Sequence, residues 1–298
     1  MGGQLVECVP NISEGRRGDV IASVADAVRR TDQVRLLDVQ SDASHNRSVV
    51  TFAGRPAAVI EAAFALCARA VDLIDMNAHR GAHPRLGAVD VVPFVPIAHV
   101  TMEEAVALAR TLGDRIWERL RVPVYFYAEA AATPQRVRLP DIRKGEYEGL
   151  REKMADPAWA PDVGEPISHP TAGATVVGAR RPLIAYNINL KTADVGVARQ
   201  IARAVRESSG GLVAIQAMGV ASEGGQAQVS MNLLEYTSTP IARVFDAVRA
   251  EAARHGVEIA ESQAVGLVPL DALVDVARHY LRLRDFDREQ VLEARLME

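Results

Sequence analysis

The sequence predicts an α/β protein made of two similar halves, each with a mixed or antiparallel β-sheet. Short apolar segments of strand-like composition alternate with longer segments in which apolar residues recur at helical spacing. The order strand, helix, strand, strand, helix, strand, helix occurs twice. An asparagine follows the first strand of each half, at Asn11 and Asn187, and a proline follows the fourth, at Pro96 and Pro269. These repeats indicate a duplicated split β-α-β unit of the ferredoxin-like type.

In the first half, the predicted strands are short apolar runs bounded by turn residues. They cover residues 5–9, 34–39, 47–53, 89–95 and 122–127. One helix is predicted from Asp19, and a second after Arg55, where Pro56 suits a first helical turn. Thr101 is expected to cap a third helix, and the acidic residues Glu103 and Glu104 suit its positive end.

Residues 129–180 are rich in proline and glycine, and we predict a helix around Glu146–Met154 within an otherwise long loop. Long loops in compact chains are often functional, although a plain linker has the same composition. The predicted domains are residues 1–178 and 179–298. In the second, strands are expected at 183–190, 211–218, 226–234 and 257–265, and helices at 193–208, 240–255, 270–284 and 288–297. We expect a ligand cleft between the halves, because domain interfaces favour ligand sites.

The composition excludes several classes of protein. The 298 residues carry a formal charge of −4, so a nucleic-acid partner has no support. Cys8 and Cys67 lie in strand-like and helix-like segments, which is typical of buried thiols in a reducing compartment. The N-terminus lacks a signal-peptide pattern, and no apolar run approaches the roughly 20 residues of a membrane helix. We therefore expect a soluble cytoplasmic protein with no membrane partner.

The stretch from Asp75 to Asp90 concentrates chemistry, with two histidines and two arginines in sixteen residues. Pro84 disfavours helical geometry at His83 and holds it on a constrained, extended turn. Histidine moves protons near neutral pH, so His83 is a candidate acid–base residue. The alternative is an ordinary solvated loop histidine.

A metal site is a second alternative in this stretch. Asp75, His79 and His83 are spaced as one helix face, but Gly81 and Pro84 interrupt a helix there. No zinc-like pair of ligands follows, and no P-loop or GxGxxG motif occurs in the chain. We therefore predict no metal.

Several ordered segments resemble the formiminotransferase family. Each match is weak alone, but their number and order along the chain are specific. They are Leu5–Gly15, Asn46–Gly54, Asp75–Asp90, Pro123–Tyr127, Gly173–Arg180, Asn187–Leu190 and Val265–Pro269. The resemblance implies transfer of a formimidoyl group from N-formimidoyl-L-glutamate to N5 of tetrahydrofolate, a step of histidine degradation, with tetrahydrofolate as co-substrate.

The resemblance also implies roles for residues. His83 matches the catalytic histidine, for which we expect a pKa near neutrality and an acidic limb of the pH profile near 6–7. Some relatives carry an aromatic residue at Ala172, so a stacking role there has no support. The segment that matches the family's folate-contacting residues is Gly164, Glu165, Pro166, Ile167, Ser168, His169, Pro170, Thr171, Ala172 and Gly173.

Other candidates follow from the chemistry of the substrates, both of which carry the carboxylates of a glutamate moiety. Arginines near His83 can bind a carboxylate with two parallel hydrogen bonds, and asparagines at strand ends can bind the pterin or the formimino nitrogen, although turn capping is the alternative. The candidate substrate-binding residues are Arg47, Arg85, Asn11, Asn187 and Asn189, with Arg80 less favoured. Any of Asp38, Asp42 and Asp90 could orient the imidazole.

The expected partners are the two small-molecule substrates and a second copy of the chain in a homodimer. The chain ends at Glu298, so we expect the product to pass to a separate cyclodeaminase. The alternative function is a folate-binding relative with other one-carbon chemistry, such as 5-formyltetrahydrofolate cyclisation or formyl transfer, or a non-catalytic folate-binding scaffold.

Overall fold

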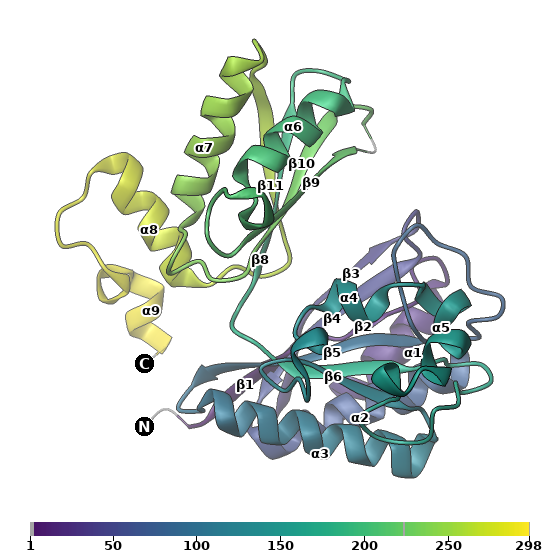
Figure 1. The fold of residues 1–298 in the computed structure, drawn as a ribbon. Helices are drawn as coiled ribbons and strands as arrows, with labels where there is room; N and C mark the ends of the chain where they lie inside the picture. The colour runs from purple at the N-terminus through teal and green to yellow at the C-terminus, as the bar shows by residue number, and fades with distance from the viewer. Residues whose placement is uncertain (1–2, 223, 298) are drawn as a thin grey trace. The chain divides into compact units, whose positions relative to one another are not determined.

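The computed structural model describes residues 3–222 and 224–297, and the chain divides into two compact units between Arg180 and Arg181 (Figure 1). The two predicted α/β halves are confirmed: the first unit has a seven-stranded mixed sheet and the second a four-stranded antiparallel sheet. Within the described ranges, no helix is both long and apolar enough to cross a membrane.

The first unit contains the β-α-β-β-α-β pattern and a parallel extension. Its strands are β1 (Leu5–Cys8), β2 (Asn11–Ile12), β3 (Val34–Asp42), β4 (Arg47–Gly54), β5 (Val89–Ala98), β6 (Val124–Ala128) and β7 (Thr175–Ala179). The order across the sheet is β3, β4, then β1 and β2 as one interrupted strand, then β5, β7 and β6. Pairs from β3 to β5 are antiparallel, whereas β7 runs parallel to both β5 and β6.

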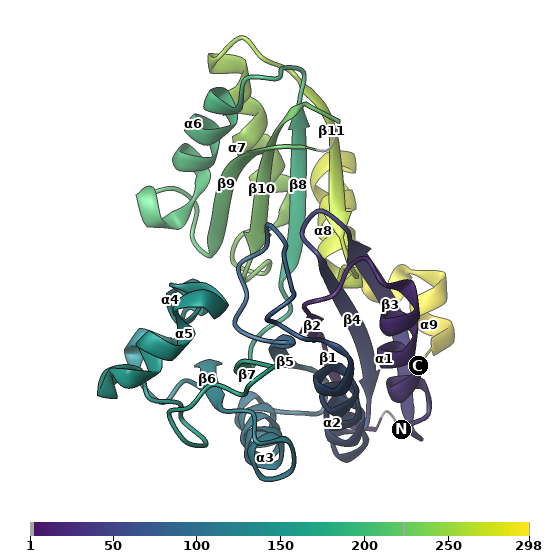
Figure 2. The same cartoon turned by 90° about the vertical axis from the view of Figure 1, so that its right-hand side faces the viewer.

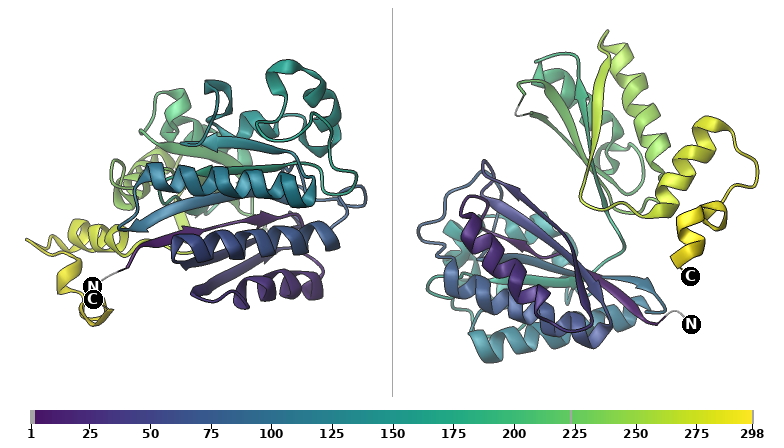
Figure 3. Two further views of the ribbon diagram at one scale, coloured as in Figure 1. Left: turned by 90° about the horizontal axis from the view of Figure 1, so that it is seen from below. Right: turned by 180° about the vertical axis from the view of Figure 1, so that it is seen from behind.

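Three long helices cover one face of this sheet, and seen from below they lie side by side (Figure 3). They are α1 (Gly18–Arg29), α2 (Pro56–Leu73) and α3 (Met102–Leu120). The predicted cap of α3 is confirmed, because Thr101 Oγ1 accepts a hydrogen bond from the Glu104 amide at 3.1 Å and the Glu104 carboxylate accepts one from the Thr101 amide at 2.8 Å. The main core lies between these helices and the sheet.

Two short helices, α4 (Leu139–Arg143) and α5 (Glu146–Ala155), lie on the opposite face of the sheet (Figure 2). They bury a second apolar cluster against β5, β6 and β7, which includes Tyr125, Ile142 and Leu150. This packing brings the C-terminal residue of α4, Arg143, to the start of β5, where it pairs with Asp90.

The prediction of a loop over most of residues 129–180 was wrong at two places. Residues Leu139–Arg143 form α4, and Thr175–Ala179 form β7, which is fully buried between two parallel neighbours. A five-residue strand that is buried on both faces is short and has no alternation of apolar and polar residues. It is therefore hard to recognise in a segment rich in proline and glycine. The junction between the units follows β7.

The second unit repeats the strand order of the first without the parallel extension. Its sheet runs β11, β8, β10, β9, which is the order of fourth, first, third and second strand seen for β5, β1/β2, β4 and β3. The apolar core lies between the sheet and helices α6 and α7. The elements are β8 (Ile184–Leu190), α6 (Val195–Val205), β9 (Ile215–Ala221), β10 (Ala227–Leu233), α7 (Ile241–Arg254), β11 (Ile259–Val265), α8 (Leu270–Leu281) and α9 (Leu292–Met297).

Candidate functional site

The loop between α2 and β5 carries His83 and is fixed to two other segments of the first unit. Gly81 lies so close to the turn after β3 that a Cβ atom there would clash with the His45 carbonyl oxygen. On the other side, the amide of Met76 donates to the Thr171 carbonyl at 2.7 Å, and Asn77 Nδ2 donates to the Pro170 carbonyl at 2.9 Å. The loop therefore joins the predicted catalytic histidine to the predicted folate-contacting segment.

His83 is half-buried and faces the start of β4. Arg47 Nη1 lies 2.7 Å from His83 Nε2, and the ring makes a second hydrogen bond to the backbone of Pro84. Proline has no N–H, so its carbonyl accepts from a ring N–H of His83, and the lone pair of the neutral ring faces Arg47. Burial, followed by the positive charges of Arg47 and Arg143, lowers the pKa of His83 to about 2. This pKa lies well below the value near neutrality that we expect of a catalytic base.

The group that orients His83 is the Pro84 carbonyl, not a carboxylate. Of the three aspartates considered, Asp42 Oδ2 lies 2.7 Å from His45 Nδ1, and Asp90 pairs with Arg143. Within the described ranges, neither of them nor Asp38 hydrogen-bonds to the imidazole of His83.

Arg47 and Arg143 form an electropositive cluster beside His83. Burial and the positive charge of Arg143 lower the pKa of the Arg47 guanidinium, which places the two arginines within each other's field. The buried Asp90 holds Arg143 through Oδ2 and accepts the Leu86 amide on Oδ1 at 2.9 Å. Arg143 was not among the sequence candidates, because it lies on a short helix inside the apparent loop.

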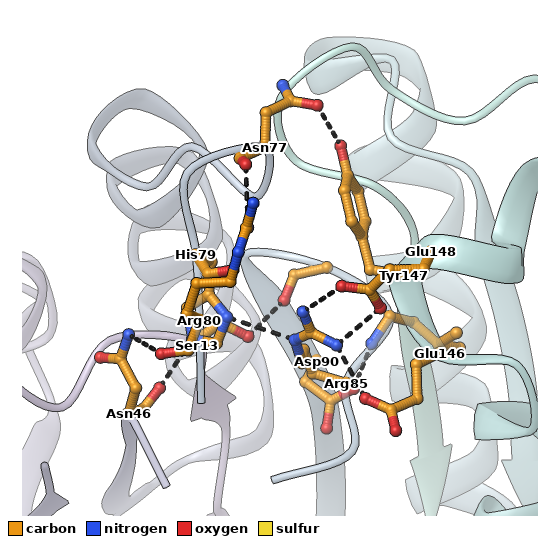
Figure 4. A network of polar contacts seen from close by, with 12 residues as sticks. Ser13, Asn46, Asn77, His79, Arg80, Arg85, Asp90, Glu146, Tyr147 and Glu148 are labelled. Atoms are coloured by element: carbon orange, nitrogen blue, oxygen red, sulfur yellow. Dashed lines mark hydrogen bonds and ion pairs between the residues drawn. The ribbon is translucent and has the colours of Figure 1, made fainter. Parts of the chain in front are cut away.

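Arg85 has a different setting from the expected carboxylate-binding role. Its side chain is buried, and its terminal nitrogens donate to Glu146 at 2.7 Å and to both oxygens of Glu148 at 2.6 and 2.8 Å (Figure 4). Its Nε donates to Nδ1 of His79 at 3.2 Å. Arg85 thus ties α5 to the loop, with its donors already committed to side chains of the protein.

His79 continues this chain of hydrogen bonds to the start of β4. Its Nε2 donates to the Asn46 carbonyl at 2.9 Å, and burial lowers its pKa, so the ring is neutral with the proton on Nε2. Asn46 has a positive φ of 49° and is held at its side chain by the Gly15 amide at 2.9 Å and the Arg80 carbonyl at 3.0 Å. This network fixes the residue directly before Arg47.

The alternative of a metal at Asp75, His79 and His83 finds no matching geometry. His79 bonds to Asn46 and Arg85, whereas His83 bonds to Arg47 and Pro84. Over residues 3–222 and 224–297, no group of three or more His, Cys, Asp or Glu side chains is arranged as metal ligands.

The segment Gly164–Gly173 borders a hollow on the surface of the first unit, which Trp117 and Arg121 also line. Ile167 is 65% exposed, whereas Ala172 is buried in the main core, so Ala172 takes no part in stacking. His169 Nδ1 accepts the amide of Ala172 at 3.0 Å and thereby shapes the turn before Gly173.

The asparagine candidates fall into both units. In the first, Asn11 lies on β2 and donates to the Val9 carbonyl at 3.1 Å, a turn contact. In the second, Asn187 and Asn189 lie on β8 and alternate with the core residues that pack under α6 and α7, so they face away from those helices. Asn189 also contacts Gln228 and Glu261 of the neighbouring strands at 2.8 and 3.0 Å.

Comparison with known proteins gives matches along almost the whole chain. Residues 5–180 match the formiminotransferase domain, N-terminal subdomain, and residues 185–295 match the formiminotransferase domain. The chain is 48% identical to a glutamate formimidoyltransferase of Thermoplasma acidophilum over 98% of this chain and 97% of that one. A glutamate formimidoyltransferase of Streptococcus pyogenes is 44% identical over 99% of both chains. The formimidoyltransferase-cyclodeaminase of Mus musculus is 47% identical over 93% of this chain and 52% of its own length.

Proposed function

This chain belongs to the formiminotransferase family and has glutamate formimidoyltransferase activity, and we propose that His83 carries the proton in the transfer. The donor is N-formimidoyl-L-glutamate, and the acceptor is N5 of tetrahydrofolate. The observation that carries the assignment is the ring tautomer of His83, because Pro84 takes one ring N–H and leaves a lone pair on Nε2.

The reaction needs one proton moved between two nitrogens. A bond forms between N5 of tetrahydrofolate and the formimidoyl carbon, and the N5 proton passes to Nε2 of His83 as the tetrahedral intermediate develops. The bond between that carbon and the glutamate nitrogen then breaks, and the same proton passes from His83 to the leaving amine. Acid–base help of this kind contributes about 10²–10⁴-fold in rate.

Arg47 is the candidate that we propose for binding a substrate carboxylate. It is half-buried next to His83, and among the residues that the structure describes no carboxylate lies within ion-pair distance of it. A buried guanidinium without an anionic partner favours an anionic ligand. Arg85 is proposed instead to position α5, because its donors are held by Glu146 and Glu148.

We propose that the segment Gly164–Gly173 contacts the folate. Its support is the pair of hydrogen bonds from Met76 and Asn77 that hold it against the loop of His83. For Asn11, Asn187 and Asn189 we keep the proposal of contacts to polar atoms of the substrates.

The location of the protein, its number of subunits, its metal requirement and the fate of its product are also proposals. We propose a cytoplasmic homodimer that needs no metal and that passes 5-formimidoyltetrahydrofolate to a separate cyclodeaminase. The proposal of two subunits predicts twice the chain mass of 32.2 kDa by light scattering. A mass of one chain would reject it.

The test of the function is turnover by the purified protein without ATP. We expect release of L-glutamate from N-formimidoyl-L-glutamate only when tetrahydrofolate is present, with no loss of rate in a chelator. Consumption of 5-formyltetrahydrofolate that depends on ATP, with no transfer from the formimidoyl donor, would instead identify the cyclisation chemistry.

A further inference from the structure

Two arginines lie beside His83, and in the described part of the chain the Arg143–Asp90 contact is the only ion pair that either of them makes. Arg143 pairs with one oxygen of Asp90, and the other oxygen accepts the Leu86 amide, so the single negative charge of Asp90 is already matched by Arg143. Arg47 has no carboxylate within ion-pair distance among the described residues, and it donates to the neutral ring of His83. Nε of Arg143 is also buried and lacks a hydrogen-bond partner in the described part of the chain.

The contact between Arg47 and His83 blocks the atom that the reaction needs. Because Nε2 carries the lone pair of the neutral ring, a donor 2.7 Å away occupies the site where the proton must arrive. The two positive charges also oppose the imidazolium that forms during the transfer. In the ligand-free state His83 is therefore a blocked and weak base.

We propose that Arg47 and Arg143 together bind the α-carboxylate of the donor, and that this carboxylate draws Arg47 away from Nε2 of His83. Arg143 is thus a further substrate-binding residue, and Asp90 is its positioning residue. This inference rests on the proposed function and goes beyond it, since it makes the donor itself activate the histidine.

The α-carboxylate is favoured over the other carboxylates by its place in the donor. It is attached to the carbon that bears the reacting nitrogen, so binding beside His83 brings that nitrogen to Nε2. The γ-carboxylate lies farther along the chain, and the carboxylates of the folate lie at the far end of that molecule from N5. A carboxylate between two guanidinium groups also forms the strong, charge-assisted hydrogen bonds that fix orientation.

The charged groups around His83 come from four elements. Arg47 begins β4, Arg143 ends α4, Asp90 lies on β5, and His45 lies in the turn after β3 with its ring centroid 6.2 Å from that of His83. Asp42 at the end of β3 is occupied by His45 and Ser44. The pair of cations that the donor would neutralise is therefore Arg47 and Arg143.

The test is to titrate His83 by NMR of histidine-labelled protein, with the signal assigned through a His83→Gln variant. Without ligand, we expect no titration of His83 between about pH 5 and 8. With saturating L-glutamate, the pKa should rise by about one unit or more, as an opposite charge nearby produces. L-Glutamine, which keeps the α-carboxylate, should have the same effect, and 4-aminobutyrate, which lacks it, should not.

Variants can show whether a loss of L-glutamate binding comes from a removed contact or from a disturbed fold. Arg143→Met should weaken L-glutamate binding about tenfold or more and raise the pKa of His83 in the free protein, because one cation is removed. Asp90→Asn/Arg143→Met removes both partners of the buried pair and should show the same loss of affinity with a folded chain. Arg115→Met, which removes an arginine that pairs with Glu61 on the helical face, should leave both measurements unchanged.

Three results would overturn the inference. They are a His83 pKa that L-glutamate does not move, an L-glutamate affinity within twofold of wild type in both Arg143 variants, and a pKa that rises with folinic acid alone. Failure of the proposed function would be distinct from these, since it would show as absent turnover in wild-type protein that still responds to L-glutamate.

Discussion

His79 and His83 lie four residues apart in one loop but bond to two different arginines, Arg85 and Arg47. Nδ1 of His79 accepts a hydrogen bond from Arg85, and its Nε2 donates one to the Asn46 carbonyl, so both ring nitrogens are hydrogen-bonded within the protein. The ring of His83 is oriented by one backbone carbonyl, and its second nitrogen meets a guanidinium that a ligand can draw away. The same residue type therefore has a structural setting at one position and a reactive one at the other.

Substitution of His83 should affect the chemical step more than binding. For His83→Ala we expect kcat to fall about 10²-fold or more, while the affinity for folinic acid changes little. The measurement is steady-state kinetics together with a direct binding titration. A kcat within about threefold of wild type would remove His83 from the role of proton carrier.

The pH dependence should differ between kcat/KM and kcat. The acidic limb of kcat/KM reports the free enzyme, in which the pKa of His83 is lowered to about 2, so we expect no limb from His83 between about pH 5 and 8. The acidic limb of kcat reports the enzyme–substrate complex, in which a bound carboxylate raises the pKa of His83. We therefore expect the acidic limb of the kcat profile to lie at a higher pH than the pKa of His83 in the free enzyme. Coincident limbs in both profiles would contradict this account.

The same lowered pKa links His83 to stability. Between about pH 2 and 6.5 the unfolded chain binds a proton on this histidine and the folded chain does not. The contribution of the neutral His83 to the free energy of unfolding is therefore complete above about pH 6.5 and is lost progressively as the pH falls toward about 2. We therefore expect wild type to lose stability relative to His83→Gln on acidification. Denaturant unfolding of the two proteins at pH 7 and pH 5 measures the difference, and a constant difference would reject it.

His79→Ala should reduce stability and retain most of the activity. The substitution leaves the Asn46 carbonyl and Arg85 Nε without partners in a buried region, which costs about 1–3 kcal/mol of unfolding free energy. We expect a lower midpoint of denaturant unfolding and a kcat within about tenfold of wild type below that midpoint. An inactive His79→Ala protein of wild-type stability would show that His79 acts in the reaction.

Much of the fold could be predicted because local patterns specify it. The antiparallel strands and amphipathic helices of both units follow apolar periodicity, and the cap at Thr101 follows a local rule. β7 and α4 could not be found, because their placement depends on β5 and β6, which lie far away in sequence. For the same reason the sequence could not show that Arg143 lies beside His83 or which residues Arg85 contacts, because only the folded chain shows that Glu148 reaches Arg85 and Asp90 reaches Arg143.

The segment Gly164–Gly173 should be protected by folate. Its exposed Ile167 and the hollow beside Trp117 offer contacts, and its hydrogen bonds to Met76 and Asn77 place it against the loop of His83. We expect folinic acid to slow amide hydrogen exchange here, with no change in a helix such as α1. Unchanged exchange of the segment at saturating folinic acid would reject the contact.

The last prediction concerns Arg85, which we propose to position Arg143 through α5. Arg85 binds Glu146 and Glu148 at the start of α5, and only Lys144 and Gly145 separate that helix from Arg143. Arg85→Met should therefore loosen α4 and α5 and raise KM for the donor several-fold, while kcat at saturation changes less. Arg85→Lys should rescue little, because an ammonium cannot reproduce the paired contact with Glu148.

The measurements are steady-state kinetics with the donor and hydrogen exchange of residues 139–155, which should become faster in Arg85→Met. Glu118→Gln, a charge change on α3 outside this network, serves as the control. If Arg85→Met instead lost kcat with an unchanged KM and unchanged exchange in α5, Arg85 would have to contact the reacting groups. Arg85 hydrogen-bonds to His79, whereas Arg47 hydrogen-bonds to His83. For this reason we expect Arg85→Met to raise KM for the donor more than it lowers kcat.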